Sequence, residues 1–290
     1  MHAYSESKPI IELDLGVSSF YSLFNSPYPG HYAATALDIY FKDDEALFPF
    51  NEGRVLRIKW FNAPRKRPDA FDKEPLILVE LAPGIVAKIL HVYPRVNIGE
   101  KLYYGDYIGD LIVSGYMYFW SERHMHVEVR SLHDPYRARG AFKLKIVRFR
   151  DVFSTNTIYG VVELVEKYFI LIKPLKTCTL GPTPLYIDIY GDKYFIEGGY
   201  PHYKFIALLG SYIDNAWGKH IEQNIDIGYC YANILSADHK IMLRDKENNT
   251  VFNGVSVFFG REQVKLVSSN IIRNVKEGDI IHIVSLKEYL

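Results

Sequence analysis

The chain has 290 residues, a length that fits two domains and leaves room for a sizeable core. Its 34 lysine and arginine residues equal its 34 aspartate and glutamate residues, so the composition argues against the strong charge bias of a nucleic-acid or anionic-membrane partner. The high content of tyrosine (23) and phenylalanine (17) favours strands, where aromatic side chains fit the pleated surface.

No targeting or membrane segment is visible in the sequence. The N-terminal stretch MHAYSESKPIIELDLG lacks a basic region followed by an apolar run, so we expect no secretory signal. No stretch has the length of apolar residues that a bilayer crossing needs. We therefore expect a cytoplasmic protein, or a secreted one if this chain is a mature form, with Cys178 and Cys230 as buried free thiols.

Short strand-like runs follow one another along the chain, separated by Gly, Pro, Asn and Asp. The clearest runs are residues 51–61, 76–92, 168–175, 193–209 and 277–286. No long amphipathic helix is evident. This pattern predicts a mostly-β protein.

Glycine turns distinguish the first half of the chain from the second. In residues 96–109, VNIGEKLYYGDYIG, glycines fall where one short strand must turn into the next. After about residue 150 the pattern changes to longer strands and a Gly/Pro-rich connection. We therefore predict one β domain at 1–150 and a β-rich accessory domain, of sandwich or similar type, at 151–290.

Residues 120–130, WSERHMHVEVR, carry two histidines a single residue apart. In an extended strand successive side chains point to opposite faces, so His124 and His126 share one face with Glu128 and Arg130. The apolar residues between them share the other face, which suits a core. The polar face is either solvent-exposed surface or a functional site.

Two upstream segments carry further candidates for such a site. His31 and Asp38 bound the segment HYAATALD, and His91 interrupts the otherwise apolar strand VAKILHV. A single strand histidine is more often hydrogen-bonded or exposed than a ligand, but two imidazoles on one face can meet at one metal centre. The order of the segments, more than any one of them, indicates a site.

Together these segments resemble the lysostaphin/LytM-type zinc endopeptidases. That family has a His and Asp pair, then Tyr-x-His-Leu, then His-Leu-His-Phe-Glu-Val. This chain has H-YAATAL-D at 31–38, ILHV at 89–92 and HMHVEV at 124–129, and its glycine-rich segment 96–109 matches the family's segment between the last two. The resemblance extends over residues 25–140, roughly half of the chain.

The resemblance implies a lysostaphin-like antiparallel sheet of the barrel-sandwich hybrid type, in which His31, Asp38 and His126 hold one zinc ion. It also implies that His91 and His124 stay unligated beside a metal-bound water, without saying which is the general base and which stabilises the oxyanion or protonates the leaving amine. Three protein ligands leave the open position that hydrolytic zinc requires. We thus expect a zinc metalloendopeptidase acting on a peptide or peptidoglycan-like substrate, with no nucleic-acid or membrane partner.

Three features depart from the family pattern. Six residues separate His31 from Asp38 where the family usually has three. On a flat strand this offset would put the two side chains on opposite faces, so a loop or bulge must intervene. Ile89 replaces the family tyrosine, and the loop before His124 lacks the usual Ser-Thr-Gly-Pro run, so the substrate preference stays open.

Two alternative functions compete with hydrolysis. Biotinyl and lipoyl carrier domains share the glycine turns, but they need a lysine at a hairpin tip, and Lys73 lies in a polar loop. A catalytically degenerate peptidase, kept as a binding or scaffolding module, is the stronger alternative, although all five candidate residues are present. The basic run at 65–67 could contact an anionic partner, but we interpret it as a solvated loop.

Overall fold

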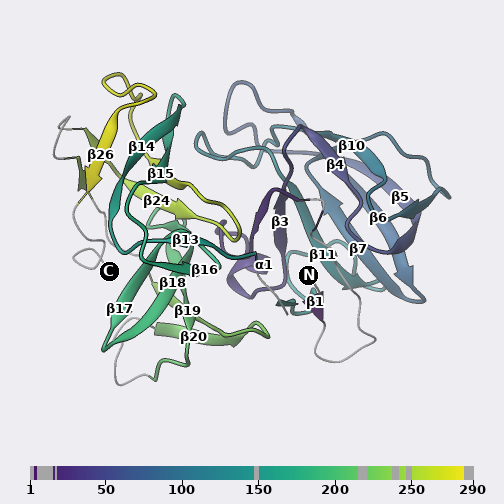
Figure 1. The fold of residues 1–290 in the computed structure, drawn as a ribbon. Coiled ribbons are helices and arrows are strands. Elements are labelled where there is room, and N and C mark those ends of the chain that lie inside the picture. Colours follow the sequence, from purple (N-terminus) through teal and green to yellow (C-terminus); the bar gives the residue numbers. More distant parts are fainter. Residues whose placement is uncertain are drawn as a thin grey trace. The chain divides into compact units, whose positions relative to one another are not determined.

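The computed structural model describes residues 3–4, 16, 18–146, 150–214, 221–236, 242–245 and 250–283. These residues confirm the prediction of a mostly-β protein, because they form 26 strands and one helical turn, α1 (Pro29–Tyr32) (Figure 1). Two compact units are present, one of Met1–Leu23 and Tyr28–Arg148 and the other of Phe24–Pro27 and Phe149–Leu290. None of the described helical residues belongs to a segment that could span a bilayer.

The first unit contains a seven-stranded antiparallel sheet. In spatial order its strands are β2 (Phe20–Ser22), β3 (Leu37–Tyr40), β11 (Met125–Ser131), β7 (Ile85–Leu90), β6 (Lys73–Ala82), β5 (Glu52–Asn62) and β9 (Lys101–Tyr103). The smaller sheets of this unit are β4 (Glu45–Leu47), β10 (Tyr107–Leu111) and β8 (Val92–Pro94) in that order, and β1 (Ala3–Tyr4) with β12 (Lys145–Ile146). Strands β3 and β11, far apart in the sequence, are therefore neighbours in the large sheet.

One face of the large sheet is an apolar core. Met125 and Val127 of β11 lie opposite Ile39 and Leu37 of β3, and Val127 also lies opposite Ile89 of β7. All five side chains are buried. Because their positions alternate with the polar ones along each strand, burying this face fixes the register of the three strands.

The opposite face of the same strands carries the polar side chains. His126 of β11 lies opposite Asp38 of β3, and Glu128 lies opposite Lys88 of β7. The predicted alternation along residues 124–130 is thereby confirmed for the strand. This polar face is not solvent-exposed surface, because all four side chains are buried.

Gly109 is the glycine on which the smaller sheet most depends. It has a φ of +153° and lies opposite Pro94, inside β10, where a turn was expected. A Cβ atom at this position would lie 2.1 Å from the carbonyl oxygen of Tyr93, so a larger residue requires a backbone shift. Gly99 and Gly105 do lie in turns, with φ values of +90° and +84°.

The second unit contains a sheet of ten strands that curves around one core. Ile158 of β14 and Leu208 of β19 belong to the same buried cluster, although several strands separate them in the sheet. In spatial order the strands are β20 (Ile221–Asp226), β21 (Tyr231–Ser236), β19 (Phe205–Gly210), β18 (Asp192–Tyr200), β24 (Gly254–Val257), β25 (Val264–Val267), β15 (Phe169–Pro174), β14 (Ile158–Val165) and β26 (Ile280–Ile283), with β17 (Tyr186–Ile189) beside β18. Two short ribbons complete this unit: β13 (Val152–Ser154) with β16 (Thr179–Gly181), and β22 (Leu243–Arg244) with β23 (Val251–Phe252).

Both cysteines lie in the second unit as free thiols. The expectation that both are buried is wrong for Cys178, which is exposed because it lies in the loop between β15 and β16. Cys230 is half-buried, and burial raises the pKa of its thiol to about 12. Cys230 is therefore a poor nucleophile at neutral pH.

Candidate metal centre

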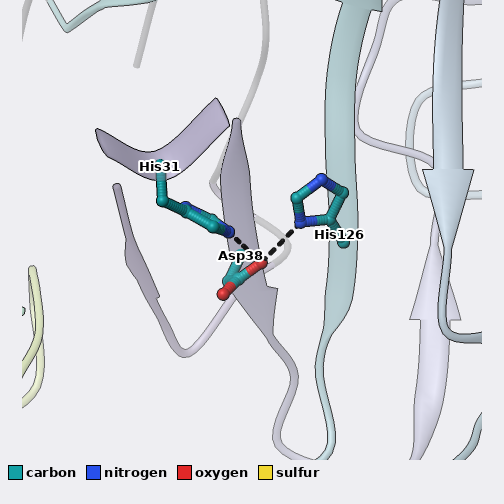
Figure 2. Close-up of side chains that lie close together, drawn as sticks. All are labelled: His31, Asp38 and His126. Atoms are coloured by element: carbon teal, nitrogen blue, oxygen red, sulfur yellow. Dashed lines mark hydrogen bonds and ion pairs between the residues drawn. The ribbon is translucent and has the colours of Figure 1, made fainter. Parts of the chain in front are cut away.

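His31, Asp38 and His126 come together in the first unit, with ligand atoms close enough to share an ion (Figure 2). The Oδ1 atom of Asp38 lies 3.1 Å from Nε2 of His31 and 3.0 Å from Nδ1 of His126. All three residues are buried, with at most 3% of their surface exposed. The three residues that the family resemblance implies as ligands are thus neighbours in space.

A helical turn accommodates the unusual spacing between His31 and Asp38. Pro29 begins α1, and its fixed φ suits the first position of a helix. His31 lies within this turn, Ala34 follows it with a φ of +53°, and the chain enters β3 at Leu37. The expected break in the strand is confirmed: the end of the helical turn and a loop at residues 33–36, and not a bulge, separate His31 from β3. In Figure 2, His31 consequently reaches Asp38 from the helical turn and His126 reaches it from the neighbouring strand.

His91 and His124, which were expected to stay unligated, lie beside this cluster. Their rings are perpendicular, with centroids 5.2 Å apart, and the ring of His91 lies 5.8 Å from that of His126. Nε2 of His124 is 3.5 Å from Oδ2 of Asp38. His91 and His124 are 8% and 7% exposed, more than any of the three clustered residues, so they lie nearest to solvent.

Main-chain carbonyls hold two of the four imidazoles. Nδ1 of His31 lies 2.7 Å from the carbonyl oxygen of Leu23, and Nδ1 of His124 lies 2.8 Å from that of Glu122. A carbonyl oxygen only accepts, so Nδ1 carries the proton in both rings. Nε2 is then the unprotonated nitrogen of each neutral ring, and in both rings it faces Asp38.

Buried carboxylates hold the other two imidazoles. Nε2 of His126 lies 3.2 Å from Oε1 of Glu128, and Nδ1 of His91 lies 2.8 Å from Oε1 of Glu74. Each ring therefore donates through the nitrogen that faces away from the cluster. Metal-binding histidines in proteins are commonly oriented by an outer acceptor of this kind, which fixes the tautomer and raises the basicity of the inner nitrogen.

Glu128 is the centre of a second layer of charged groups. Its Oε1 accepts hydrogen bonds from Nζ of Lys88 at 2.7 Å and from the hydroxyl of Tyr28 at 2.9 Å, and its Oε2 accepts from Arg130 at 2.5 Å. Burial by itself would raise the pKa of the Glu128 carboxyl, but the hydrogen bond to His126 and the charge of Lys88 hold it well below its usual value. Glu128 is therefore a permanent carboxylate behind His126.

The charges around Asp38 keep it ionised as well. Burial would raise the pKa of its carboxyl, but His124 and His31 lower it well below its usual value. Burial would likewise lower the pKa of His31, yet the Asp38 carboxylate raises it above its ordinary value. Burial lowers the pKa of His124 to about 4, so this ring is neutral at pH 7 and its positive charge acts on Asp38 only in acid.

The residues present fit a zinc ion. Bonds of about 2.0–2.1 Å at tetrahedral angles place donor atoms about 3.3 Å apart, close to the two distances from Asp38 Oδ1. Without a cation or an extra proton, the unprotonated imidazole nitrogens would face that oxygen lone pair to lone pair, which is repulsive. Among the described residues that make up these two layers, three carboxylates (Asp38, Glu74 and Glu128) outnumber two fixed cations (Lys88 and Arg130). With the four imidazoles neutral, the cluster carries a negative excess, which a cation or a proton on His31 would balance.

The sequence prediction missed the outer layer. Lys88 gave a usable signal, because a lysine inside the apolar run VAKIL needs a buried partner. Glu128 was placed on the correct face but received no role. Glu74 gave no local signal, since it reaches His91 only through the pairing of β6 with β7.

The basic run at 65–67 lies in a loop with Arg65 and Lys66 exposed, as predicted, but it also makes specific contacts. Arg67 forms an ion pair with Asp69 at 2.7 Å and donates to the carbonyl oxygens of Tyr118 and Ser121. Nζ of Lys66 lies 4.0 Å from the centre of the Tyr118 ring. These contacts tie the basic loop to the loop that leads into His124.

A family model matches residues 13–146, and its description is the N-terminal domain of a domain of unknown function, DUF8155. The matched range contains every residue of the cluster and of the layer behind it. No curated protein and no solved structure matches the chain.

Proposed function

We propose that the first unit is a zinc-dependent hydrolase that cleaves a peptide bond with an activated water molecule. The observation that carries this proposal is the placement of His31 and His126 on one oxygen of Asp38, with two further oriented imidazoles beside them. A cluster held only for stability would not need four histidines that each donate outward and leave a nitrogen facing inward.

The described residues divide into two groups by position. His31, Asp38 and His126 would hold the ion, because they are the most deeply buried of the five and have converging donor atoms. A zinc ion bound there would polarise a carbonyl group and lower the pKa of its water toward 7. His91 and His124 are nearest to solvent, where a substrate arrives, and can exchange protons with water and the leaving amine.

The resemblance to the lysostaphin/LytM-type endopeptidases supports a peptide as the substrate, and a peptidoglycan-like polymer is a natural first choice. The substitution of Ile89 for the family tyrosine does not speak against hydrolysis itself. Ile89 is fully buried on the core face of β7, so its side chain points away from the histidines. Adding a hydroxyl group at this position would not bring it to the reaction.

The test is the zinc content of the purified protein, measured as zinc per chain after dialysis, together with release of dye from labelled casein and labelled peptidoglycan. We expect one zinc per chain and release of dye from at least one substrate. Asp38→Ala should lose both, because the rings of His31, His124 and His126 all face this carboxylate. His133→Ala is the matched control, since His133 is an exposed histidine just beyond β11. A protein that binds no zinc would overturn the proposal, and one zinc without hydrolysis would favour the binding or scaffolding module.

A further inference from the structure

We propose that Glu74 positions His91 as the proton acceptor of the reaction, and that His124 does not have this role. The inference rests on the proposed hydrolase function and goes beyond it, because the sequence pattern alone treats the two histidines alike. It is carried by the way in which the chain brings His91 to the site.

His91 lies on the face of the sheet that its position in the strand would not predict. Along β7 the odd-numbered residues, such as Ile89, point into the apolar core, so a continued strand would bury the His91 side chain there. Instead its ring contacts the rings of His124 and His126 on the polar face. The strand must therefore be interrupted at this residue.

The interruption is a left-handed backbone conformation at His91, whose φ is +67°. Strand β7 ends at Leu90 and β8 begins at Val92, so His91 is the single residue between them. A side chain other than glycine is strained in this region by roughly 1–2 kcal/mol, and such strain persists only where neighbouring groups hold it. The group that holds it here is Glu74.

Glu74 binds His91 twice through the same oxygen. Its Oε1 accepts the backbone N–H of His91 at 2.7 Å and Nδ1–H of the ring at 2.8 Å. The other oxygen, Oε2, accepts the hydroxyl of Ser114. Glu74 and Ser114 are completely buried, so water cannot compete for these bonds. One carboxylate thus fixes the backbone, the tautomer and the ring plane of His91, and Nε2 is left to face the cluster.

The two candidate proton acceptors differ in the group behind them. Nδ1–H of His91 donates to a carboxylate, whereas Nδ1–H of His124 donates to the neutral carbonyl of Glu122. A carboxylate stabilises the positive ring that forms when Nε2 takes a proton, which is the role of the aspartate in a Ser-His-Asp triad. The carbonyl offers only a dipole. His91 is therefore the better acceptor of the two.

The proton balance follows from this assignment. As the water oxygen bonds to the scissile carbonyl carbon, Nε2 of His91 takes one proton from the water, and Glu74 remains a carboxylate. When the carbon–nitrogen bond breaks, the same proton passes from Nε2 to the leaving nitrogen. The products are a carboxylic acid and an amine, and His91 returns to its starting tautomer.

The experiment uses the full chain loaded with zinc and has two independent readouts. Nitrogen-15 NMR of the imidazoles reports which nitrogen of His91 carries the proton, with the signal assigned by its loss in His91→Gln. We expect the Nδ1–H tautomer in the wild type and in Glu74→Gln, whose amide oxygen still accepts, and loss of this fixed tautomer in Glu74→Leu. The Nε2–H tautomer in the wild type would overturn the positioning role, whether or not any hydrolysis is found.

The second readout is the rate of dye release from the substrate that the wild type hydrolyses. Glu74→Gln keeps the hydrogen bonds and removes the charge, so its kcat should fall about 10- to 100-fold at unchanged KM and unchanged zinc content. Glu74→Gln combined with His91→Ala should be no slower than His91→Ala alone, because Glu74 acts only through His91. Glu52→Gln, which changes an exposed glutamate at the start of β5, is the control and should keep the wild-type rate. A wild-type rate in Glu74→Gln would refute the assignment, whereas an inactive wild type with the expected tautomer would refute the hydrolase function and leave the positioning role standing.

Discussion

Replacing Glu128 should damage the first unit in two ways that can be measured separately. In the native structure this carboxylate is the partner of Lys88 at 2.7 Å and of Arg130 at 2.5 Å, and all three side chains are at most 4% exposed. The substitution Glu128→Gln would leave two buried cations facing a neutral amide. Breaking a buried ion pair by removing one partner typically destabilises a protein by about 3–5 kcal/mol, because the remaining charge cannot regain its water.

The matched control is an ion pair of similar length on the surface of the same unit. Arg95 and Asp110 approach to 2.8 Å, but their side chains are 56% and 42% exposed. Asp110→Asn should therefore cost less than about 1 kcal/mol. Urea unfolding of the zinc-free protein would compare the two variants. The reasoning fails if Glu128→Gln costs no more than Asp110→Asn.

A further variant tests whether charge is the cause. Adding Lys88→Met to Glu128→Gln removes one of the two stranded cations, so the double variant should regain part of the lost unfolding free energy. Zinc affinity should not recover with it. Glu128 also holds Nε2 of His126 at 3.2 Å, and loss of such an outer acceptor typically weakens metal binding by about 10- to 100-fold.

Three other outcomes are expected. His126→Ala should lose zinc and activity together, whereas His91→Ala should keep zinc while its turnover falls by roughly a hundredfold, as measured by zinc per chain and dye release. Burial lowers the pKa of His202 in the second unit to about 3, so the folded state favours the neutral ring. Its stabilising contribution is complete above the unfolded pKa of about 6.5 and is lost as the pH falls from there toward 3, by up to roughly 5 kcal/mol. Urea midpoints at several pH values should show this slope for the second unit, and His202→Gln should flatten it. Gly109→Ala should cost about 2 kcal/mol or more, because the added Cβ meets a carbonyl oxygen, whereas Gly99→Ala, which has open space around it, should cost about 1 kcal/mol in the same unfolding assay.

The sequence was sufficient for those parts of the site that follow a strand's alternation. His126 and Glu128 were placed on one face because a single apolar residue separates them. The register of β11 with β3 and β7 confirms that they share a face. The mostly-β fold followed from short apolar runs and turn residues in the same way. These features depend on local patterns that a strand repeats every two residues.

The rest of the site depends on places where the repeat is broken. The helical turn that carries His31 was seen only as a spacing that no flat strand could accommodate. The left-handed conformation of His91 could not be read from the letters, because a residue other than glycine rarely adopts it and nothing local requires it. Its cause is Glu74, 17 residues earlier in the chain, and that contact exists only once β6 and β7 have paired.

The membership of residues 24–27 in the second unit has a consequence for synthesis of the chain. These four residues interrupt the first unit, directly after Leu23, whose carbonyl holds His31. The backbone N–H of Phe24 finds its acceptor in Glu197, 173 residues later. At about 5–20 residues per second, a ribosome needs roughly 10–35 seconds to add that stretch. The backbone N–H of Phe24 therefore has no Glu197 to donate to until long after the strands that carry the histidines have left the ribosome.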